Sequence, residues 1–433
     1  MPVSAKINKF PLRNPRVLVA PLDWGLGHAT RCIPIIKELL IQRCNVIVAC
    51  AGPQKVLLRE EFPSLSFIEL RGYEIKYDKN RALTILRLVS SIPKILIRIK
   101  RERAWLRHFI GREELDLVIS DNRYGLTTPG VFCIFMTHQL LIKTVFGGWA
   151  DRILQTLNYR TIRHFSRCWV PDITPIGLAG ELSHPKRMPS ISTRYIGWLS
   201  RFGAAGDGRG ADGLSGMDAG GVSGSSAAAH WGGHGGFLLA LLSGPEPQRT
   251  LLEKDILRQA AELGKAPAGC RLVIVRGLPG GGKAVSGLSV SGEPAASGQL
   301  APGATASGLP AWITLHDHLP AGALEPLIRD AGLILARSGY STLMDLQRLG
   351  KRALLVPTPG QTEQEYLGSY LAQKGWASCV DQRDFSLAAA FEMLDARGDG
   401  AAHGAAAGIG ALEGATEPGG QLAAEIKAVL AML

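Results

Sequence analysis

The chain has 433 residues, 46% of them apolar, which is typical of a globular protein with two domains of ordinary size. It holds no run of about 18 uncharged apolar residues, and its N-terminal stretch lacks the apolar core of a secretory signal. We therefore expect neither a membrane-spanning helix nor export. The seven cysteines form no CxxC pair and no Cys/His cluster with zinc spacing, which predicts reduced thiols in a cytoplasmic protein.

The net charge of +11 is unevenly distributed along the chain. Residues 81–107 contain eight Lys or Arg and a single acid, Glu102, with Leu and Ile interleaved. This pattern is typical of a basic amphipathic helix pair, which could lie on an anionic membrane surface. The alternative is a solvated helix face whose apolar side packs on the domain. The region has no aromatic-interleaved basic motif, so we expect no nucleic-acid partner.

The first half of the chain alternates short apolar runs with helical patterns. Strands are predicted at 16–21, 45–50, 66–70, 116–120, 131–136, 168–170 and 195–198, and helices at 29–42 and 149–165, among others. Such alternation favours a doubly wound, mostly parallel sheet within an α/β domain covering residues 15–200.

A second α/β domain is predicted at 237–395, after a flexible linker at 201–236 that is rich in Gly, Ala and Ser. Its first elements are a strand at 237–244, a helix at 251–263 and a strand at 272–275. A low-complexity insert at about 277–310 follows, and alternation then resumes from 312 to 380. A Gly/Ala-rich stretch and a terminal helix (421–432) occupy residues 396–433.

Two strand-to-helix junctions in the second domain indicate a phosphate-binding edge. Residues 337–339 and 357–360 each follow a short apolar run and precede a helical pattern. In open α/β sheets ligands bind at such junctions, because helix N-terminal N–H groups attract phosphate. Asp345 lies four residues after Ser341, hence on the same helix face, and its carboxylate suits a sugar hydroxyl.

The motif Gly25-Leu26-Gly27-His28 follows the first strand and opens a helix. Its two glycines permit a tight turn and a close approach to a ligand. His28 could act as a general base, since the ordinary pKa of histidine lies near physiological pH. Asp23 could orient His28 or cap the turn, and a capping turn with an incidental histidine is the alternative for the whole motif.

Four further segments carry polar groups at predicted strand ends. Residues 243–250 (SGPEPQRT) could contact a diphosphate through hydroxyl, backbone and Arg249, or could be a proline-bearing helix entry. Asp121 and His138 follow two strands of the first half and could face a cleft, or be ordinary loop polarity. Residues 277–283 match GxxxxGK, but Ala284 replaces the magnesium-binding Ser/Thr, so we predict no P-loop.

Together these motifs resemble the MurG-like family of GT-B glycosyltransferases, which carry the family 28 C-terminal domain. The Gly25–His28 turn is similar to the N-terminal loop of the family, and residues 137–139 resemble its His-Glu-Gln element. Residues 337–342 with Asp345 resemble its donor-phosphate loop and ribose-binding acid, and residues 364–366 resemble its donor-sugar segment. The likeness is closest to bacterial members that carry SGPEPQRT and PTPGQTEQEY.

Three positions depart from the family pattern. Asp345 stands where the family commonly has Glu, and Glu365 stands where it has a second Gln. Residues 243–250 carry prolines in place of a glycine-rich GGSQG-type loop. These departures bear on the identity of the sugar and of the acceptor.

The resemblance implies a GT-B fold, two Rossmann-like doubly wound domains facing a cleft, with acceptor on the first and donor on the second. It implies inverting transfer of a hexose or N-acetylhexosamine from a UDP-linked sugar, with no metal and no cofactor besides this co-substrate. The basic region suggests a lipid-linked acceptor and a peripheral position on the inner face of the plasma membrane. A nucleotide-sugar 2-epimerase and a non-catalytic nucleotide-sugar binding protein are the alternatives.

The predicted site has three groups of residues. The catalytic pair is His28 with Asp23. The acceptor side comprises Gly25, Gly27, Asp121 and His138. The donor side comprises Ser243, Gly244, Gln248, Arg249, Arg337, Ser338, Gly339, Tyr340, Ser341, Thr342, Asp345, Gln364 and Glu365.

Overall fold

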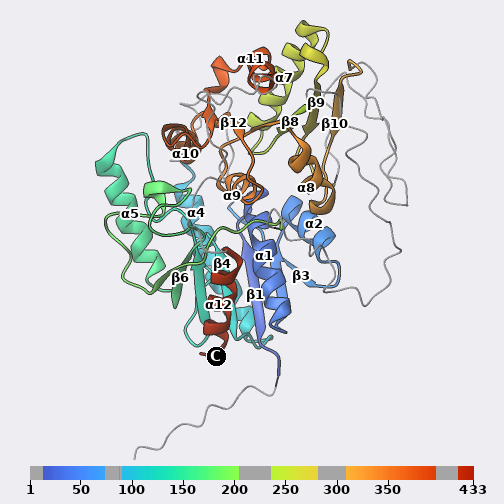
Figure 1. Cartoon of the computed structure of the whole chain (residues 1–433). Helices are drawn as coiled ribbons and strands as arrows, with labels where there is room; N and C mark the ends of the chain where they lie inside the picture. The colour runs from blue at the N-terminus through green and yellow to red at the C-terminus, as the bar shows by residue number, and fades with distance from the viewer. Residues whose placement is uncertain (1–12, 74–86, 88–89, 204–235, 281–308, 396–417) are drawn as a thin grey trace, which may run out of the picture.

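The computed structural model describes residues 13–73, 87, 90–203, 236–280, 309–395 and 418–433. Two parallel sheets with their helices form two α/β domains that face each other (Figure 1). This architecture confirms the predicted fold class. Most of the predicted linker, the insert at 277–310, the stretch at 396–417 and the basic region before residue 90 lie outside the described residues, apart from residue 87.

The first sheet has seven strands in the order β3-β2-β1-β4-β5-β6-β7, and every pairing is parallel. The strands are β1 (Arg16–Pro21), β2 (Asn45–Cys50), β3 (Ser66–Glu69), β4 (Leu117–Asp121), β5 (Phe132–Met136), β6 (Arg167–Val170) and β7 (Thr193–Tyr195). The strand order reverses beside β1, so the carboxyl ends of β1 and β4 form the switch point at which such sheets bind ligands.

Helices cover both faces of this sheet because side chains of its strands alternate between the faces. Val17 and Val19 of β1 join a core cluster with α1 (Gly27–Ile41) and α2 (Gly52–Glu61). Leu18 of β1 joins a second cluster with α4 (Ile92–Ile110) and α5 (Gly148–Ile162). The near-continuous apolar strands read in the sequence reflect this burial on both faces.

The second sheet repeats the pattern with the order β10-β9-β8-β11-β12-β13. Its strands are β8 (Phe237–Leu241), β9 (Arg271–Val275), β10 (Ile313–His316), β11 (Leu333–Ala336), β12 (Ala353–Leu355) and β13 (Ser378–Cys379). Its helices are α7 (Gln248–Leu263), α8 (Ala321–Asp330), α9 (Tyr340–Arg348), α10 (Thr362–Gln373) and α11 (Leu387–Asp395). The switch point here lies at the carboxyl ends of β8 and β11.

Some predicted boundaries differ from the observed ones. Helix α7 begins at Gln248, three residues before the predicted start, because Arg249 pairs with Glu253 one turn later and so belongs to the helix. The last strand of the first half ends at Tyr195, whereas 195–198 was predicted. Ile196 and Trp198 are apolar because they are buried in the core, and the intervening Gly197 has a positive φ of 79°.

The predicted basic helix pair is represented among the described residues by α4 alone. Its one acid, Glu102, is 3% exposed and accepts hydrogen bonds from Arg123 Nε at 3.0 Å and Gly125 N at 3.2 Å. This ion pair fixes α4 to the loop after β4. Among the described residues, no helix has the length and apolarity needed to cross a membrane.

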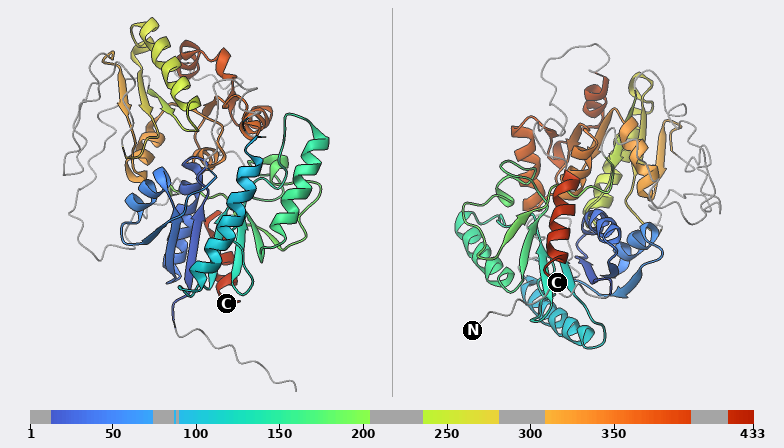
Figure 2. Two further views of the ribbon diagram at one scale, coloured as in Figure 1. Left: turned by 180° about the vertical axis from the view of Figure 1, so that it is seen from behind. Right: turned by 60° about the horizontal axis from the view of Figure 1, so that its bottom comes forward.

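The terminal helix α12 (Pro418–Leu430) returns to the first domain (Figure 2). Leu422, Ile426 and Val429 are buried in the same core cluster as residues of α1. Glu425 accepts hydrogen bonds from Arg167 Nη1 at 2.5 Å and from Trp169 Nε1 at 3.1 Å. The helix is thus held on the domain by apolar burial and by a charged clamp to β6.

We predict that Ile426→Ala lowers the free energy of unfolding by about 2–5 kcal/mol, because it leaves a cavity where α12 meets α1. The matched control is Lys427→Ala, an exposed neighbour on α12, which should change stability by less than about 0.5 kcal/mol. Urea unfolding of the full chain checks both. Equal midpoints for the two variants would show that α12 does not contribute to the core.

Candidate functional site

The carboxyl edges of the two sheets meet where the N-terminus of α1 contacts the N-terminus of α9. Ser341 Oγ donates a hydrogen bond to Gly27 O at 2.7 Å. A Cβ added at Gly27 would lie 2.9 Å from Ser341 Oγ, so the glycine permits this close approach. Gly25, which precedes it, has a φ of 87°, a backbone conformation that L side chains rarely adopt.

His28 lies in the first turn of α1, with its side chain 14% exposed. Its Nδ1 is 2.9 Å from Asp121 Oδ2 and 2.9 Å from Arg31 Nη2. Burial lowers the pKa of His28, as do Arg31 and His138, and these effects outweigh the opposing effect of Asp121. His28 is therefore neutral at neutral pH, which is the form that a general base requires.

Asp121 is the last residue of β4 and is fully buried. Arg31 donates to both of its oxygens, with Nε 2.8 Å from Oδ2 and Nη2 on Oδ1. Burial opposes ionisation of this carboxyl group, but Arg31 and His28 lower its pKa to about 2. Asp121 is thus a carboxylate that His28 faces directly, as its position at a strand end suggested.

His138, just after β5, joins the two domains. Its Nδ1 is 3.1 Å from Arg31 Nη1, and its Nε2 is 2.7 Å from Glu363 Oε1. Its ring stacks on Tyr340 with a centroid distance of 4.2 Å and an interplanar angle of 6°. Tyr340 and Glu363 belong to α9 and α10 of the second domain, so His138 contacts both of these helices directly.

Glu363, in the first turn of α10, also accepts a hydrogen bond from Gln139 Nε2. Burial opposes its ionisation, but His138 and Arg31 bring its pKa below the usual value for Glu. The second domain therefore places a carboxylate against a polar pocket of the first. The predicted site lacked Glu363, and it lacked Arg31.

The sequence held a signal for Arg31 but little for Glu363. Arg31 lies three residues after His28, which places both side chains on one face of α1. Glu363 stands two positions before Glu365 in the segment 361–366, and local pattern does not distinguish the two acids. Only the contact with His138 does so.

The assignment of Asp23 as the partner of His28 needs correction. Asp23 Oδ1 accepts a hydrogen bond from Tyr73 N at 2.9 Å, and a Cβ at Gly72 would overlap the Asp23 carboxylate. This carboxylate holds the chain after β3, which is neither of the two roles expected for it. The carboxylate that orients His28 is Asp121.

Two arginines predicted to contact phosphate form hydrogen bonds with other groups of the protein. Arg249 binds Glu246 and Glu253 through charged hydrogen bonds of 2.7 Å. Arg337 is fully buried, and its guanidinium donates to the carbonyl oxygens of Val356 at 3.0 Å and Gln248 at 2.8 Å. Each guanidinium is thus bound within its own domain, and contact of either with a phosphate remains a prediction.

The burial of Arg337 lowers its pKa to about 9. This side chain links the loop after β12 to the start of α7 by its bonds to backbone carbonyls. Gln248, which was also predicted to bind donor, is 1% exposed and takes part through its carbonyl. Ser243 and Gly244 are partly exposed after β8, and Gly244 has a φ of 99°.

Asp345, on α9 of the second domain, binds residues at the end of the first domain. Its Oδ1 accepts from Ser200 Oγ at 2.8 Å, and its Oδ2 accepts from Arg201 Nε at 3.1 Å. Burial raises the pKa of this carboxyl group despite the nearby Arg201. A ribose hydroxyl that reached these oxygens would have to displace Ser200 or Arg201, so the ribose role remains a prediction.

Gln364 and Glu365 shape the loop before α10. Gln364 Oε1 accepts from Thr358 N at 2.9 Å, and Glu365 Oε1 accepts from Gly360 N at 2.9 Å. Ser338 is buried and donates to Gln364 O at 2.7 Å. These contacts are structural, and any grip on a donor sugar by the two side chains remains a prediction.

The N-terminus of α9 has no side-chain cap. Its N-cap residue is Gly339, and its first turn comprises Tyr340, Ser341 and Thr342. A helix N-terminus of this kind presents backbone N–H groups and a positive dipole end to an anion. A cavity of about 520 Å³ lies on the same side of the second sheet, between α2 and the loops after β9 and β10, and His318 and Asp317 line it.

The described residues contain no group of three or more His, Cys, Asp or Glu placed to hold a metal ion. The polar groups where the two domains meet are the His28–Asp121 pair, His138 stacked on Tyr340, and the uncapped N-terminus of α9. Independence from metal remains a prediction.

Comparison with known proteins agrees with this geometry. Residues 321–402 match the model of the glycosyltransferase family 28 C-terminal domain. No curated protein sequence matches the chain.

Solved structures similar to this chain are glycosyltransferases. The glycosyltransferase of kitacinnamycin aligns with a TM-score of 0.55 at 14% identity, covering 96% of each chain. SnogD from Streptomyces nogalater aligns at 0.52 and 14%, covering 96% of this chain and 100% of its own. The spinosyn rhamnosyltransferase SpnG, complexed with thymidine diphosphate, aligns at 0.51 and 15%, covering 96% and 98%.

The two facing parallel sheets of this chain are those of the GT-B fold. The chain is therefore a glycosyltransferase of the GT-B type, and residues 321–402 match the glycosyltransferase family 28 C-terminal domain.

Proposed function

We propose that the protein transfers a sugar from a nucleoside-diphosphate donor on the second domain to a hydroxyl group of an acceptor on the first. One observation carries this proposal. His28, paired with Asp121, stands at the N-terminus of α1 where the uncapped N-terminus of α9 meets it from the other domain. A base and an anion-attracting helix end thus share one cleft.

The donor half of the proposal rests on α9. This helix falls within the residues that match the family 28 domain, and its N-terminal amides suit a diphosphate. The similar spinosyn rhamnosyltransferase has thymidine diphosphate bound, which supports a nucleoside diphosphate as the donor's leaving group here. We take a UDP-linked hexose or N-acetylhexosamine as the donor, with the thymidine series as the first alternative to test.

The proposed chemistry is a direct, inverting displacement. His28 Nε2 takes the proton of the acceptor hydroxyl as its oxygen attacks the anomeric carbon of the donor sugar. The bond from that carbon to the diphosphate breaks, and the leaving diphosphate is stabilised by the N-terminus of α9. Asp121, on Nδ1, stabilises the positive charge that His28 acquires.

The acceptor half of the proposal rests on α4 and α5, which cover the same face of the first sheet (Figure 2). On α4 the only buried residues are Glu102 and Leu106. Large apolar residues on both helices are about half exposed or more: Ile92, Leu96, Ile97, Trp149, Ile153 and Leu157. Packing on the domain therefore accounts for only part of the apolar pattern, and a lipid surface accounts for the remainder.

Basic side chains accompany this apolar surface. Lys94, Lys100 and Arg101 are exposed on α4, and Arg152 and Arg160 are exposed on α5. Cations interleaved with exposed Ile, Leu and Trp favour an anionic membrane. We propose that the protein binds the membrane through this surface and takes a lipid-linked acceptor there.

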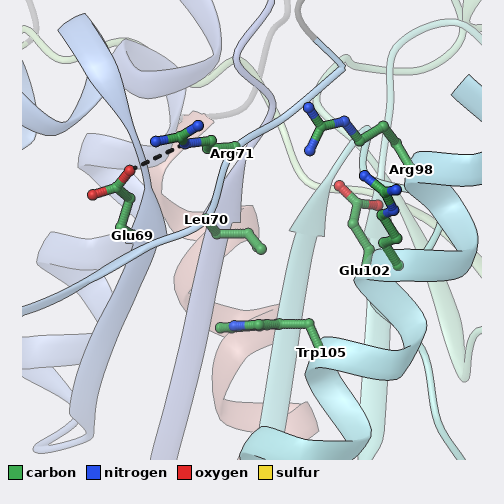
Figure 3. A pocket seen from close by; sticks show the side chains of 7 residues that line it. Glu69, Leu70, Arg71, Arg98, Glu102 and Trp105 are labelled. Carbon is green, nitrogen blue, oxygen red and sulfur yellow. Dashed lines mark hydrogen bonds and ion pairs between the residues drawn. The ribbon is translucent and has the colours of Figure 1, made fainter. Parts of the chain in front are cut away.

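A cavity of about 310 Å³ lies between the end of β3 and α4 (Figure 3). Arg71, Arg98 and Arg101 line it, together with Trp105. Glu69 and Glu102 also line it, but Glu102 is bound to Arg123. Guanidinium groups of this kind suit a phosphate on the acceptor, and their place beside α4 fits a lipid-linked one.

We predict that His28→Ala lowers kcat/KM by about 10²–10⁴-fold, because the acceptor loses its general base. Binding of the donor nucleotide should persist, since the second domain is unchanged. Measurement of nucleoside-diphosphate release with an acceptor that supports turnover checks this. Unchanged turnover in His28→Ala would remove His28 from the mechanism.

The same assignment fixes the sign of the pH dependence. The base works when deprotonated, and the pKa of His28 lies below its usual value. Activity should therefore be level at neutral pH and fall only as the pH drops through that lowered pKa. In Asp121→Asn, loss of the carboxylate charge should move this fall to still lower pH.

For the donor site we predict that a saturating UDP- or thymidine-diphosphate sugar raises the melting temperature. At 100 times the dissociation constant, binding contributes about 2.7 kcal/mol. Thr342→Asp should weaken this shift, because a carboxylate in the first turn of α9 repels the diphosphate. The control, Ser386→Asp, changes the residue that caps α11 and should leave the shift intact. If no nucleotide sugar stabilises the wild type, the donor assignment is wrong.

For the membrane surface we predict that the protein sediments with vesicles containing anionic lipid and much less with neutral ones. The double variant Leu96→Ser/Ile97→Ser should weaken this binding by roughly tenfold or more, because it removes apolar side chains that enter the lipid. Ile41→Ser, at the end of α1 and 68% exposed in the wild type, is the matched control. Equal binding of both variants would contradict the assignment of α4.

A further inference from the structure

Arg31 is only 2% exposed, and its guanidinium contacts three polar residues of the site. Its Nε and Nη2 hold the two oxygens of Asp121. The same Nη2 is 2.9 Å from His28 Nδ1, and Nη1 is 3.1 Å from His138 Nδ1. One guanidinium thus touches both histidines of the site and the carboxylate beside them.

This arrangement fixes the proton positions on His138. A guanidinium only donates hydrogen bonds, so His138 Nδ1 must offer a lone pair to Arg31. The ring proton of neutral His138 then lies on Nε2, which is 2.7 Å from Glu363 Oε1. Both nitrogens of His138 are occupied, and His138 is not available to take a proton from an acceptor.

His28 is in a different situation. Its Nδ1 faces a donor, Arg31 Nη2, and an acceptor, Asp121 Oδ2, while Nε2 makes no hydrogen bond within the described residues. Arg31 grips Asp121 at two points, which fixes the plane of the carboxylate and directs Oδ2 at the ring. Arg31 Nη2 donates to Asp121 Oδ1, whereas Asp121 Oδ2 is the acceptor that faces His28 Nδ1, so we place the Nδ1 proton toward Asp121 and the lone pair of His28 on Nε2.

We propose that Arg31 is the positioning residue of the site, which aims Asp121 at His28 so that Nε2 is the basic nitrogen and withdraws His138 from proton transfer. The inference rests on the proposed function, in which His28 is the base. Glu363 contributes from the second domain, since its carboxylate binds Nε2 of His138. The base is thus fully assembled when α10 lies against the first domain.

If Arg31 and Asp121 only stabilised the fold, removal of Arg31 would not change the pH at which His28 titrates. The charged and titratable groups that face His28 are Arg31 on its own helix, Asp121 on β4, His138 after β5 and Glu363 on α10. Removal of the Arg31 cation leaves the Asp121 charge unopposed. His28 should then hold its proton to higher pH, which a loss of packing alone would not cause.

The test is NMR of the full chain with ¹⁵N-labelled histidine, in which ring shifts report the tautomer and the titration of each imidazole. In the wild type, Nδ1 of His138 should carry no proton, because Arg31 Nη1 donates to it. In Arg31→Gln, His28 should titrate at higher pH, and His138 should no longer be confined to one tautomer. Arg31→Lys keeps the charge but not the fork, so it should restore the His28 titration only in part.

The control is Lys37→Gln, which removes an exposed cation of α1 and its ion pair with Glu61 of α2 and should leave the His28 titration unchanged. In kinetics, the acid limb of kcat/KM should move to higher pH in Arg31→Gln while the KM for the donor stays the same. Unchanged His28 titration in folded Arg31→Gln would overturn the proposal. Should Arg31→Gln not fold, a proton on Nδ1 of His138 in the wild type would overturn it equally.

Failure of this inference is distinguishable from failure of the proposed function. The NMR experiment needs no substrate, so a wild type with the expected tautomers but without binding or turnover of any nucleotide sugar counts against the function. An active wild type in which Arg31→Gln leaves the pH profile and the His28 titration unchanged counts against Arg31 alone.

Discussion

The buried ion pair between Arg31 and Asp121 is the interaction on which the site depends. It joins the first turns of α1 to the carboxyl end of β4, at the switch point of the first sheet. Both partners are out of contact with water, so loss of either would leave an uncompensated charge and cost about 3–5 kcal/mol. The pair persists because each oxygen of the carboxylate has a guanidinium donor, and the same guanidinium serves two histidines.

The second domain completes this arrangement through a few contacts at helix N-termini. Ser341 bonds to Gly27, Tyr340 stacks on His138, and Glu363 binds the same ring. These contacts accompany a core cluster that runs from β1 and α1 into α9 and α10 without interruption. The N-termini of α9 and α10 are therefore in direct contact with the first domain in this structure.

Much of the fold could be predicted from the sequence, since apolar runs between turn residues mark strands that are buried on both faces. The junction after each strand was also readable, and it placed His28, Asp121 and His138 at the correct edge. The partners of long charged side chains were not readable. Arg249 and Arg337 stand at phosphate-friendly junctions, yet their guanidinium groups turn inward to Glu253 and to backbone carbonyls.

The same limit explains why the partner of Asp23 was predicted wrongly and why Glu363 was missed. Asp23 is adjacent to the glycine turn in sequence, but it serves the chain after β3, and the carboxylate on His28 comes from a strand 93 residues away. Glu363 reaches a histidine 225 residues away, from the other domain. Such pairings depend on how two sheets face each other, which local patterns do not contain.

In the proposed mechanism, His28 deprotonates the acceptor hydroxyl as it attacks the sugar, and the diphosphate leaves at the N-terminus of α9. The most direct test is the anomeric configuration of the transferred sugar in the product, read by NMR from a donor of known configuration. A single displacement with one base predicts the opposite configuration in the product. Retention of the donor configuration would contradict the account, because it requires a different route from the one that His28 and α9 provide.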